Sequence, residues 1–447
     1  MIKPKLRFFD LAMIIVSMVI GIGIFRNVKG VAESAGSESI FFLAWIVGGL
    51  VCICGALIFA EIGARFPVAG AYYKMFSLCY HPILAFMLIW VYLILNAGST
   101  AAVALIAAQY IRPVILPASM QNINGDHLMF FIIITALFTL NFFGIRTGAT
   151  TQNILSLVKI ALMLAFISTI FFLPGVQSHQ TNDAANHSSN NFFLALGASL
   201  IGIFFTYGGY QNTANLGGDV QQPQKNIPRA VFTAIIIVMV LYLAINVVYV
   251  RVLGFDTIRQ SELIAADLAR KLFGAKGVAF ASVAIFISAL GFINTELLYN
   301  PRVMYAMAQE GILPRIFMNV HNRKQVQEFA LFFCTALIVV MFLLLQTFEN
   351  LLNYVMFNDT LSFAFAAFCI FILRKKKVGD EIPGFRIKWY PFIPVIFILM
   401  QLVVTVNVAY KDPKNSFIAV CVMAVGLPFY FLLKKMNKKN TVSDSNS

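Results

Sequence analysis

Two glycine pairs lie in the middle of long apolar segments of this 447-residue chain. Gly21 and Gly23 flank a single isoleucine in the first segment. Gly208 and Gly209 are adjacent in a later one. Glycine allows a helix to unwind, and unwound backbone at membrane depth is tolerated only where it lines a cavity. Broken helix ends offer free N–H groups to an anion and free carbonyls to a cation, so the pairs predict a site for a zwitterion.

The alternative is that these glycines only let neighbouring membrane helices pack closely. One pair alone would not decide between packing and binding. Glycine-interrupted helices at corresponding positions of two halves are, however, typical of transporter binding sites. We therefore expect the two breaks to form one.

Lys159 lies inside an apolar segment, about ten residues from the start of that segment. Charge at such depth costs free energy and usually has a function. Burial of an ammonium favours its neutral form, which would let this lysine take up and release a proton. We expect Lys159 to be a proton-coupling or conformational-switch residue. The alternative is a static cation that hydrogen bonds to carbonyls.

Two carboxylates also lie within apolar segments. Glu296 would contact a cationic substrate side chain or pair with Lys159, or it is a hydrogen-bonded carboxyl between helices. Asp359 fits a polar hinge as well as a gate contact. Near the end of another segment, Glu61 precedes Arg65 by one helical turn, and we expect these two to form a structural ion pair.

The composition places these segments in a lipid bilayer. Hydrophobic residues make up 60% of the chain and charged residues only 12%, against roughly 25% charged residues in soluble domains. The mean hydropathy is +0.82. Lysine and arginine occupy short gaps between apolar runs instead of one basic face, so nucleic acid is not an expected partner.

We expect no cofactor, no metal site and no catalytic centre. The six cysteines include no CxxC pair, and the five histidines are scattered over loops and segment ends. The sequence contains neither a Ser–His–Asp arrangement nor a Walker-type phosphate loop. An enzyme and an ATP-driven pump are therefore both disfavoured.

About twelve segments are long enough to cross a bilayer as helices, because a hydrocarbon core of about 30 Å needs roughly 20 apolar residues. We expect an all-α integral membrane protein with one transmembrane domain over 1–434 and a cytoplasmic tail over 435–447. The segments lie near 9–35, 39–63, 83–111, 128–146, 150–173, 192–216, 230–252, 277–307, 329–346, 350–373, 391–410 and 415–433.

An even number of crossings puts both ends of the chain on one side of the membrane. That side carries 22 of the 33 lysines and arginines, the other side carries 10, and Lys159 is left inside a segment. Cytoplasmic loops carry the excess of positive charge. Both termini should therefore face the cytoplasm of a cell membrane.

The two glycine breaks fall in the first helix of each of two five-helix units. Units with an odd number of crossings have opposite orientations in the membrane, as an inverted repeat requires. We expect repeat one over about 9–173 and repeat two over about 192–373, with two peripheral helices over about 391–433.

Four motifs resemble those of the amino acid–polyamine–organocation (APC) superfamily of permeases, near the bacterial relatives of the L-type amino acid transporters. The resemblance covers nearly the whole chain. The motifs are GIGIF at 21–25, similar to GSGIF; EIGARFP at 61–67, similar to ELGxRFP; QPQKNIPRA at 222–230, similar to NPxxNIPRA; and RVMYAMA at 302–308 in the eighth segment.

This resemblance implies a leucine-transporter-like fold that moves amino acids by alternating access, as a proton symporter or an exchanger. N–H groups of residues 22–24 would hold the substrate carboxylate. Carbonyls near 19–20 and 205–208 would hold the amino group, with Phe205 as a gate. The expected substrate contacts are Val19, Ile20, Gly21, Ile22, Gly23, Ile24, Phe205, Thr206, Gly208 and Gly209.

The chain departs from the family pattern at three positions near the breaks. Ile22 stands where the family usually has serine, so a hydroxyl contact to the carboxylate is lost. Gln211 and Asn212 replace the usual residues after the second break. The family carries a lysine at the position of Lys159, where sodium-coupled relatives hold a sodium ion, and an ammonium there would make the ion redundant.

Two alternative functions stay open at this point. A polyamine or cationic amino acid antiporter is suggested by Glu296. A receptor that senses an amino acid without moving it would belong to another class. No obligatory protein partner is expected, because no cysteine is clearly placed in an external loop, where L-type relatives join a second subunit.

Overall fold

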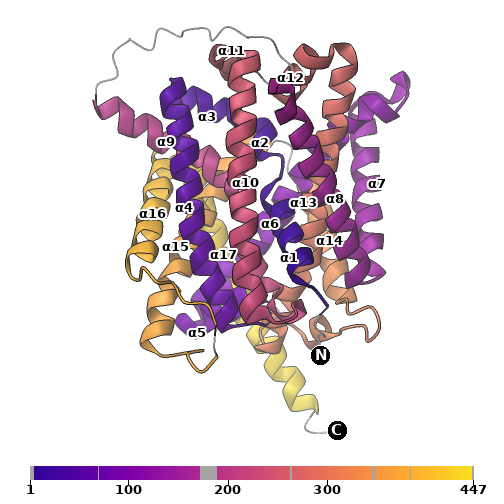
Figure 1. Ribbon diagram of the computed structural model, residues 1–447. Coiled ribbons are helices and arrows are strands. Elements are labelled where there is room, and N and C mark those ends of the chain that lie inside the picture. The colour runs from indigo at the N-terminus through magenta and orange to yellow at the C-terminus, as the bar shows by residue number, and fades with distance from the viewer. Residues whose placement is uncertain are drawn as a thin grey trace.

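The computed structural model describes residues 5–68, 70–171, 189–261, 264–344, 348–382 and 384–444. Within these ranges every regular element is a helix, and the long helices run side by side in one bundle (Figure 1). The β-type pairing in this part of the chain is an isolated parallel bridge between Leu6 and Val220. The prediction of an all-α protein is confirmed.

Eleven helices of the described residues are long and apolar enough to cross a membrane, and a shorter apolar helix, α14, accompanies them. They match the twelve predicted segments, so the predicted multi-span membrane protein is confirmed. The helices are α1 (Phe8–Val19) with α2 (Gly23–Arg26), α4 (Glu38–Arg65), α6 (Pro82–Ile115), α7 (Ile123–Phe142), α8 (Ile145–Ser168), α9 (Ser189–Tyr207), α10 (Pro223–Leu253), α13 (Ala275–Gln309), α14 (Glu328–Leu344), α15 (Phe348–Lys375), α16 (Phe392–Lys411) and α17 (Pro413–Asp444).

Shorter helices fill connections that the sequence analysis left without structure. The connection between the predicted segments 230–252 and 277–307 contains α11 (Phe255–Gln260) and α12 (Ile264–Phe273). In α12, Ile264 and Leu268 lie one turn apart and are buried, whereas Arg270 and Lys271 are exposed, as in an amphipathic surface helix. The short elements are α3 (Val28–Ala35), α5 (Ala71–Cys79), α11 (Phe255–Gln260), α12 (Ile264–Phe273), η1 (Ala118–Met120), η2 (Thr169–Phe171), η3 (Tyr210–Asn215), η4 (Gly217–Asp219) and η5 (Arg315–Met318).

Both predicted breaks are present, and glycines bring the two broken segments into contact. A Cβ on Gly23 would lie 2.9 Å from Thr206 Oγ1 and 3.0 Å from its Cα. Gly209 has φ +115°, and a Cβ there would lie 2.7 Å from the carbonyl oxygen of Met18. The glycines therefore serve as close contacts between the first and sixth spans as well as unwinding points.

Burial places the first span at the centre of the bundle. In the apolar window of Phe8–Arg26, 78% of the residues are buried, against 22% in Pro413–Lys434. Apolar side chains of α17 such as Phe417 and Phe431 are exposed on the protein surface, as expected of a helix that faces lipid. The ends of the described chain lie at the same end of the bundle as α5, and α3, α11 and α12 lie at the opposite end (Figure 1).

Glu61, which is fully buried, connects several elements at the end of the bundle where the chain ends lie. Its Oε1 accepts from Arg65 Nε at 3.1 Å, which confirms the predicted Glu61–Arg65 ion pair. Its Oε2 accepts from Arg374 Nη2 at 2.7 Å and from the Ile387 N–H at 2.8 Å. This carboxylate therefore joins the end of α4 to the end of α15 and to the segment before α16.

Glu61→Gln should destabilise the protein strongly. It leaves Arg65 and Arg374 without their shared counter-charge, and breaking a buried ion pair typically costs about 3–5 kcal/mol. Thermal unfolding of the detergent-solubilised protein would show a large fall in Tm. Glu381→Gln, at an exposed carboxylate of the same region, is the control and should leave Tm unchanged. Equal Tm values for the two variants would contradict the structural role of Glu61.

Candidate functional site

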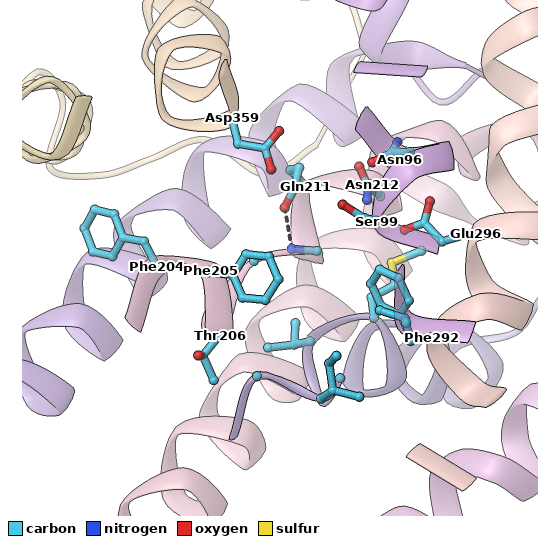
Figure 2. A pocket seen from close by; sticks show the side chains of 18 of the residues that line it. Asn96, Ser99, Phe204, Phe205, Thr206, Gln211, Asn212, Phe292, Glu296 and Asp359 are labelled. Atoms are coloured by element: carbon cyan, nitrogen blue, oxygen red, sulfur yellow. Dashed lines mark hydrogen bonds between the residues drawn. The ribbon is translucent and has the colours of Figure 1, made fainter. Parts of the chain in front are cut away.

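A cavity of about 80 Å³ lies where the two broken spans meet. A water molecule needs roughly 10–15 Å³ in the same measure, so the cavity has room for several water-sized groups. The backbone of both breaks forms one part of its wall. Side chains from α6, α13 and α15 complete it, among them Ser99, Glu296 and Asp359 (Figure 2).

Most of the predicted substrate contacts meet at this cavity. Ile20 and Ile24 are fully buried and do not line it, and the carbonyl of Ile20 accepts from Lys159. Those that do line it are Val19, Gly21, Ile22, Gly23, Phe205, Thr206, Gly208 and Gly209.

The first break interrupts one nearly continuous helical span. Helix α1 ends at Val19 and α2 begins at Gly23. Asn27, between α2 and α3, keeps helical angles (φ −76°, ψ −12°), so the chain stays helical up to Ala35. The first N–H groups of a helix have no carbonyl one turn earlier to accept from them, which leaves those of Gly23 and Ile24 available at the break.

Carbonyls of the first break already have partners on neighbouring helices. Tyr242 on α10 places its hydroxyl 2.8 Å from the Val19 oxygen and 3.1 Å from the Thr206 oxygen, so it bridges both breaks. Ser288 on α13 donates to the Gly21 oxygen at 3.1 Å. The sequence analysis missed Tyr242 and Ser288. In the sequence, the only feature that could have pointed to them is a polar side chain within an apolar segment.

Lys159 lies against the first break. It is 2% exposed, and its Nζ donates to Ile20 O at 2.6 Å, to Ser17 Oγ at 2.8 Å and to Ser17 O at 3.2 Å. Gly291 on α13 leaves space for it, because a Cβ there would lie 2.8 Å from Nζ. Three oxygen partners suit a static cation as well as a switch, so the geometry leaves both interpretations open.

Glu296 faces the cavity and does not pair with Lys159. Its Oε2 accepts from Asn300 Nδ2 at 3.0 Å, and Asn300 Oδ1 in turn accepts from Asn96 Nδ2 at 3.3 Å. Asp359 lines the cavity from α15. The idea of a Glu296–Lys159 ion pair is therefore not supported, because each side chain bonds to other groups.

The two unusual residues after the second break brace its backbone. Gln211 Oε1 accepts from the Gly209 N–H at 2.9 Å, as the dashed line in Figure 2 shows. Asn212 accepts from the hydroxyl of Tyr92 and donates to that of Tyr299, both at 2.7 Å. Gln211 thus supplies an acceptor for a backbone N–H of the unwound segment, and Asn212 ties that segment to tyrosines of α6 and α13.

The segment after the second break, which contains η4, is held at the end of the bundle where the chain ends lie. Asp219 in η4 is fully buried, and its Oδ2 accepts from Arg302 Nε at 2.9 Å. The Asp219 carbonyl accepts from the N–H groups of Lys5 and Leu6, both at 2.8 Å. Arg302 belongs to the fourth family motif, and this ion pair gives that motif a physical role.

Comparisons with known proteins find relatives over nearly the whole chain. Residues 6–427 match the family described as amino acid permease. The chain is 28% identical over 436 residues to the human large neutral amino acids transporter small subunit 2, which covers 96% of this chain and 80% of that one. It is 27% identical over 439 residues to the serine/threonine exchanger SteT of Bacillus subtilis (strain 168), covering 97% and 98%.

A third relative is the human cystine/glutamate transporter, 27% identical over 446 residues, which covers 98% of this chain and 87% of that protein. These relatives are named for different substrates, yet each matches nearly the whole chain. With two broken spans around a central cavity, a multi-span helical fold and a family match over almost its entire length, this chain belongs to the amino acid permease family of the APC superfamily.

Proposed function

We propose that this protein is a secondary transporter that carries amino acids across the cell membrane by alternating access, as an exchanger or a proton symporter. The observation that carries this proposal is the cavity between the two breaks, because it joins backbone groups of both signs at one place. The names of the relatives describe amino acid carriers and support the class of substrate.

In this proposal the substrate lies across the two breaks. Its carboxylate accepts from the N–H groups of Ile22 and Gly23, the two of residues 22–24 that line the cavity, and these suit an anion without help from a side chain at Ile22. Its amino group donates to carbonyls at residues 205–208 and to the free lone pairs of those near Val19. Phe205, which lines the cavity, closes over the occupied site.

Lys159 is proposed as the residue that couples proton movement to transport or switches the conformation of the protein. Its ammonium joins α8 to the backbone of the first break, so a change in its charge would alter the hydrogen bonds that hold Ser17 and Ile20. A movable charge at a helix break is one physical means of biasing two states of a transporter. Both termini are proposed to face the cytoplasm.

Counterflow in proteoliposomes tests the transport function. The purified chain alone is reconstituted, the vesicles are loaded with a mixture of unlabelled amino acids, and labelled amino acids are supplied outside. Transient accumulation of label that depends on the internal load is the expected result. Saturable binding to the same protein without any counterflow would assign it to the sensors instead, and activity without a second subunit would fit a single-chain carrier.

A further inference from the structure

The wall of the central cavity carries acidic side chains and no basic ones. Glu296 on α13 and Asp359 on α15 both line it, and none of the described lining residues is a lysine, arginine or histidine. Figure 2 shows their carboxylates approaching from different sides, with Gln211 between them in this view. A substrate in this cavity therefore meets two acidic groups in addition to the backbone of the breaks.

Neutral groups hold Glu296 in place. The side chain is 4% exposed, and its Oε2 accepts from the amide of Asn300 at 3.0 Å. The phenol of Tyr299 also interacts with the carboxyl. The amide of Asn96, which lines the cavity, supports Asn300 from the other side. These contacts fix the carboxyl at the cavity wall but supply no positive charge.

Asp359 has still less support from the protein. The structure gives it no hydrogen bond and no ion pair with the side chains that it describes. Lys159, the cation of the neighbouring spans, bonds to Ser17 and Ile20 and is not among the lining residues. Within the part of the chain that the structure describes, neither cavity carboxylate thus pairs with a basic side chain.

Two acidic groups at membrane depth are costly unless a partner offsets their charge. A zwitterionic substrate bound across the breaks has no net charge to offer. Phe292, one turn before Glu296 on α13, lies 3.7 Å from where a Cβ on Gly21 would stand. Since a helical turn rises about 5.4 Å, Glu296 lies roughly one turn from the first break, within reach of a substrate side chain.

We propose that this cavity selects basic amino acids, whose side-chain ammonium or guanidinium is held between Glu296 and Asp359. The inference rests on the proposed function, which places the backbone groups of the substrate at the two breaks. It goes beyond the family match, because the relatives described above are named for neutral amino acids, for serine and threonine, and for cystine and glutamate.

Three ligands that differ by one group each provide the test. Free lysine, norleucine (which lacks the side-chain ammonium) and cadaverine (which lacks the carboxylate) compete for uptake of labelled lysine by proteoliposomes of the full chain. Because an unpaired buried charge costs several kcal/mol, lysine should compete at least about tenfold better than norleucine. It should also compete better than cadaverine, which cannot use the N–H groups of the first break.

Neutral variants of the two carboxylates should remove this preference. Glu296→Gln should lower the ratio of lysine to norleucine affinity by about tenfold or more, and Asp359→Asn should lower it in the same direction. Glu33→Gln, at an exposed carboxylate of α3, is the control for loss of a negative charge and should keep the ratio. If Glu296→Gln does not fold, the ligand series on the unmodified protein and the Asp359→Asn variant decide whether the cavity selects basic amino acids.

The outcomes separate this inference from the transport proposal. Counterflow of neutral amino acids without exchange of lysine, or an unchanged ratio in Glu296→Gln, would overturn the basic-substrate assignment and leave the carrier intact. Cadaverine competing as well as lysine would overturn it in favour of diamines. No exchange of any amino acid would instead remove the proposed function.

Discussion

Replacing Lys159 by alanine should abolish most gradient-driven transport. The change removes the donor to Ile20 O, Ser17 Oγ and Ser17 O and leaves buried oxygens without a partner. Each such oxygen costs about 1–3 kcal/mol. Coupling between sites is worth about 5–150-fold, so uptake driven by a pH gradient should fall at least about tenfold.

Uptake by proteoliposomes with and without a pH gradient measures this effect. A coupling or switching lysine predicts that the gradient no longer stimulates the variant, even where exchange at equal pH persists. A static cation predicts instead that both rates fall together with thermal stability. Lys271→Ala, at an exposed lysine of α12, serves as the control. Undiminished gradient-driven uptake by Lys159→Ala would refute the coupling role.

The periodic and compositional features of the sequence were sufficient for the fold. Long apolar runs can satisfy their backbone in lipid only as helices, so the twelve segments follow from length and hydropathy alone. The glycine breaks were equally visible, because two glycine pairs lie at corresponding positions of the two halves. The inverted repeat and the cytoplasmic orientation of the termini remain predictions that rest on pattern and charge.

Contacts between distant parts of the chain could not be predicted in the same way. Arg374 reaches Glu61 across 313 positions, and nothing near either residue encodes the pairing. Tyr242 and Ser288 look like ordinary polar residues of apolar helices until the fold brings them to the carbonyls of the first break. Helix α12 was missed because its buried face is short and its charged face is typical of a loop.

In the site as well, features encoded by neighbouring residues could be predicted and contacts between distant residues could not. Backbone groups at the breaks were predicted because glycine spacing and the family motif are local. The isolation of Glu296 from Lys159 was not, because it depends on which neighbour each side chain meets: Asn300 for one, Ser17 and Ile20 for the other. That separation frees one carboxylate for the cavity and one cation for the break. Binding and coupling would then use different charges.

Gly291→Ala should reproduce the transport defect of Lys159→Ala while leaving the protein folded. The added Cβ would lie 2.6 Å from Ser17 Oγ and 2.7 Å and 2.8 Å from Lys159 Cε and Nζ, so the ammonium has to leave its oxygens. The obstructing lysine atoms are the flexible end of a side chain, so the backbone can stay in place, Tm should fall no further than in Lys159→Ala, and gradient-driven uptake should fall about tenfold. Gly30→Ala is the matched control, since a Cβ there meets nothing within 4 Å.

In the Lys159→Ala background, Gly291→Ala should cost no further transport, because the effects of residues that act through one contact are not additive. Additive losses in that double variant would show that Gly291 acts by some route other than the position of the lysine.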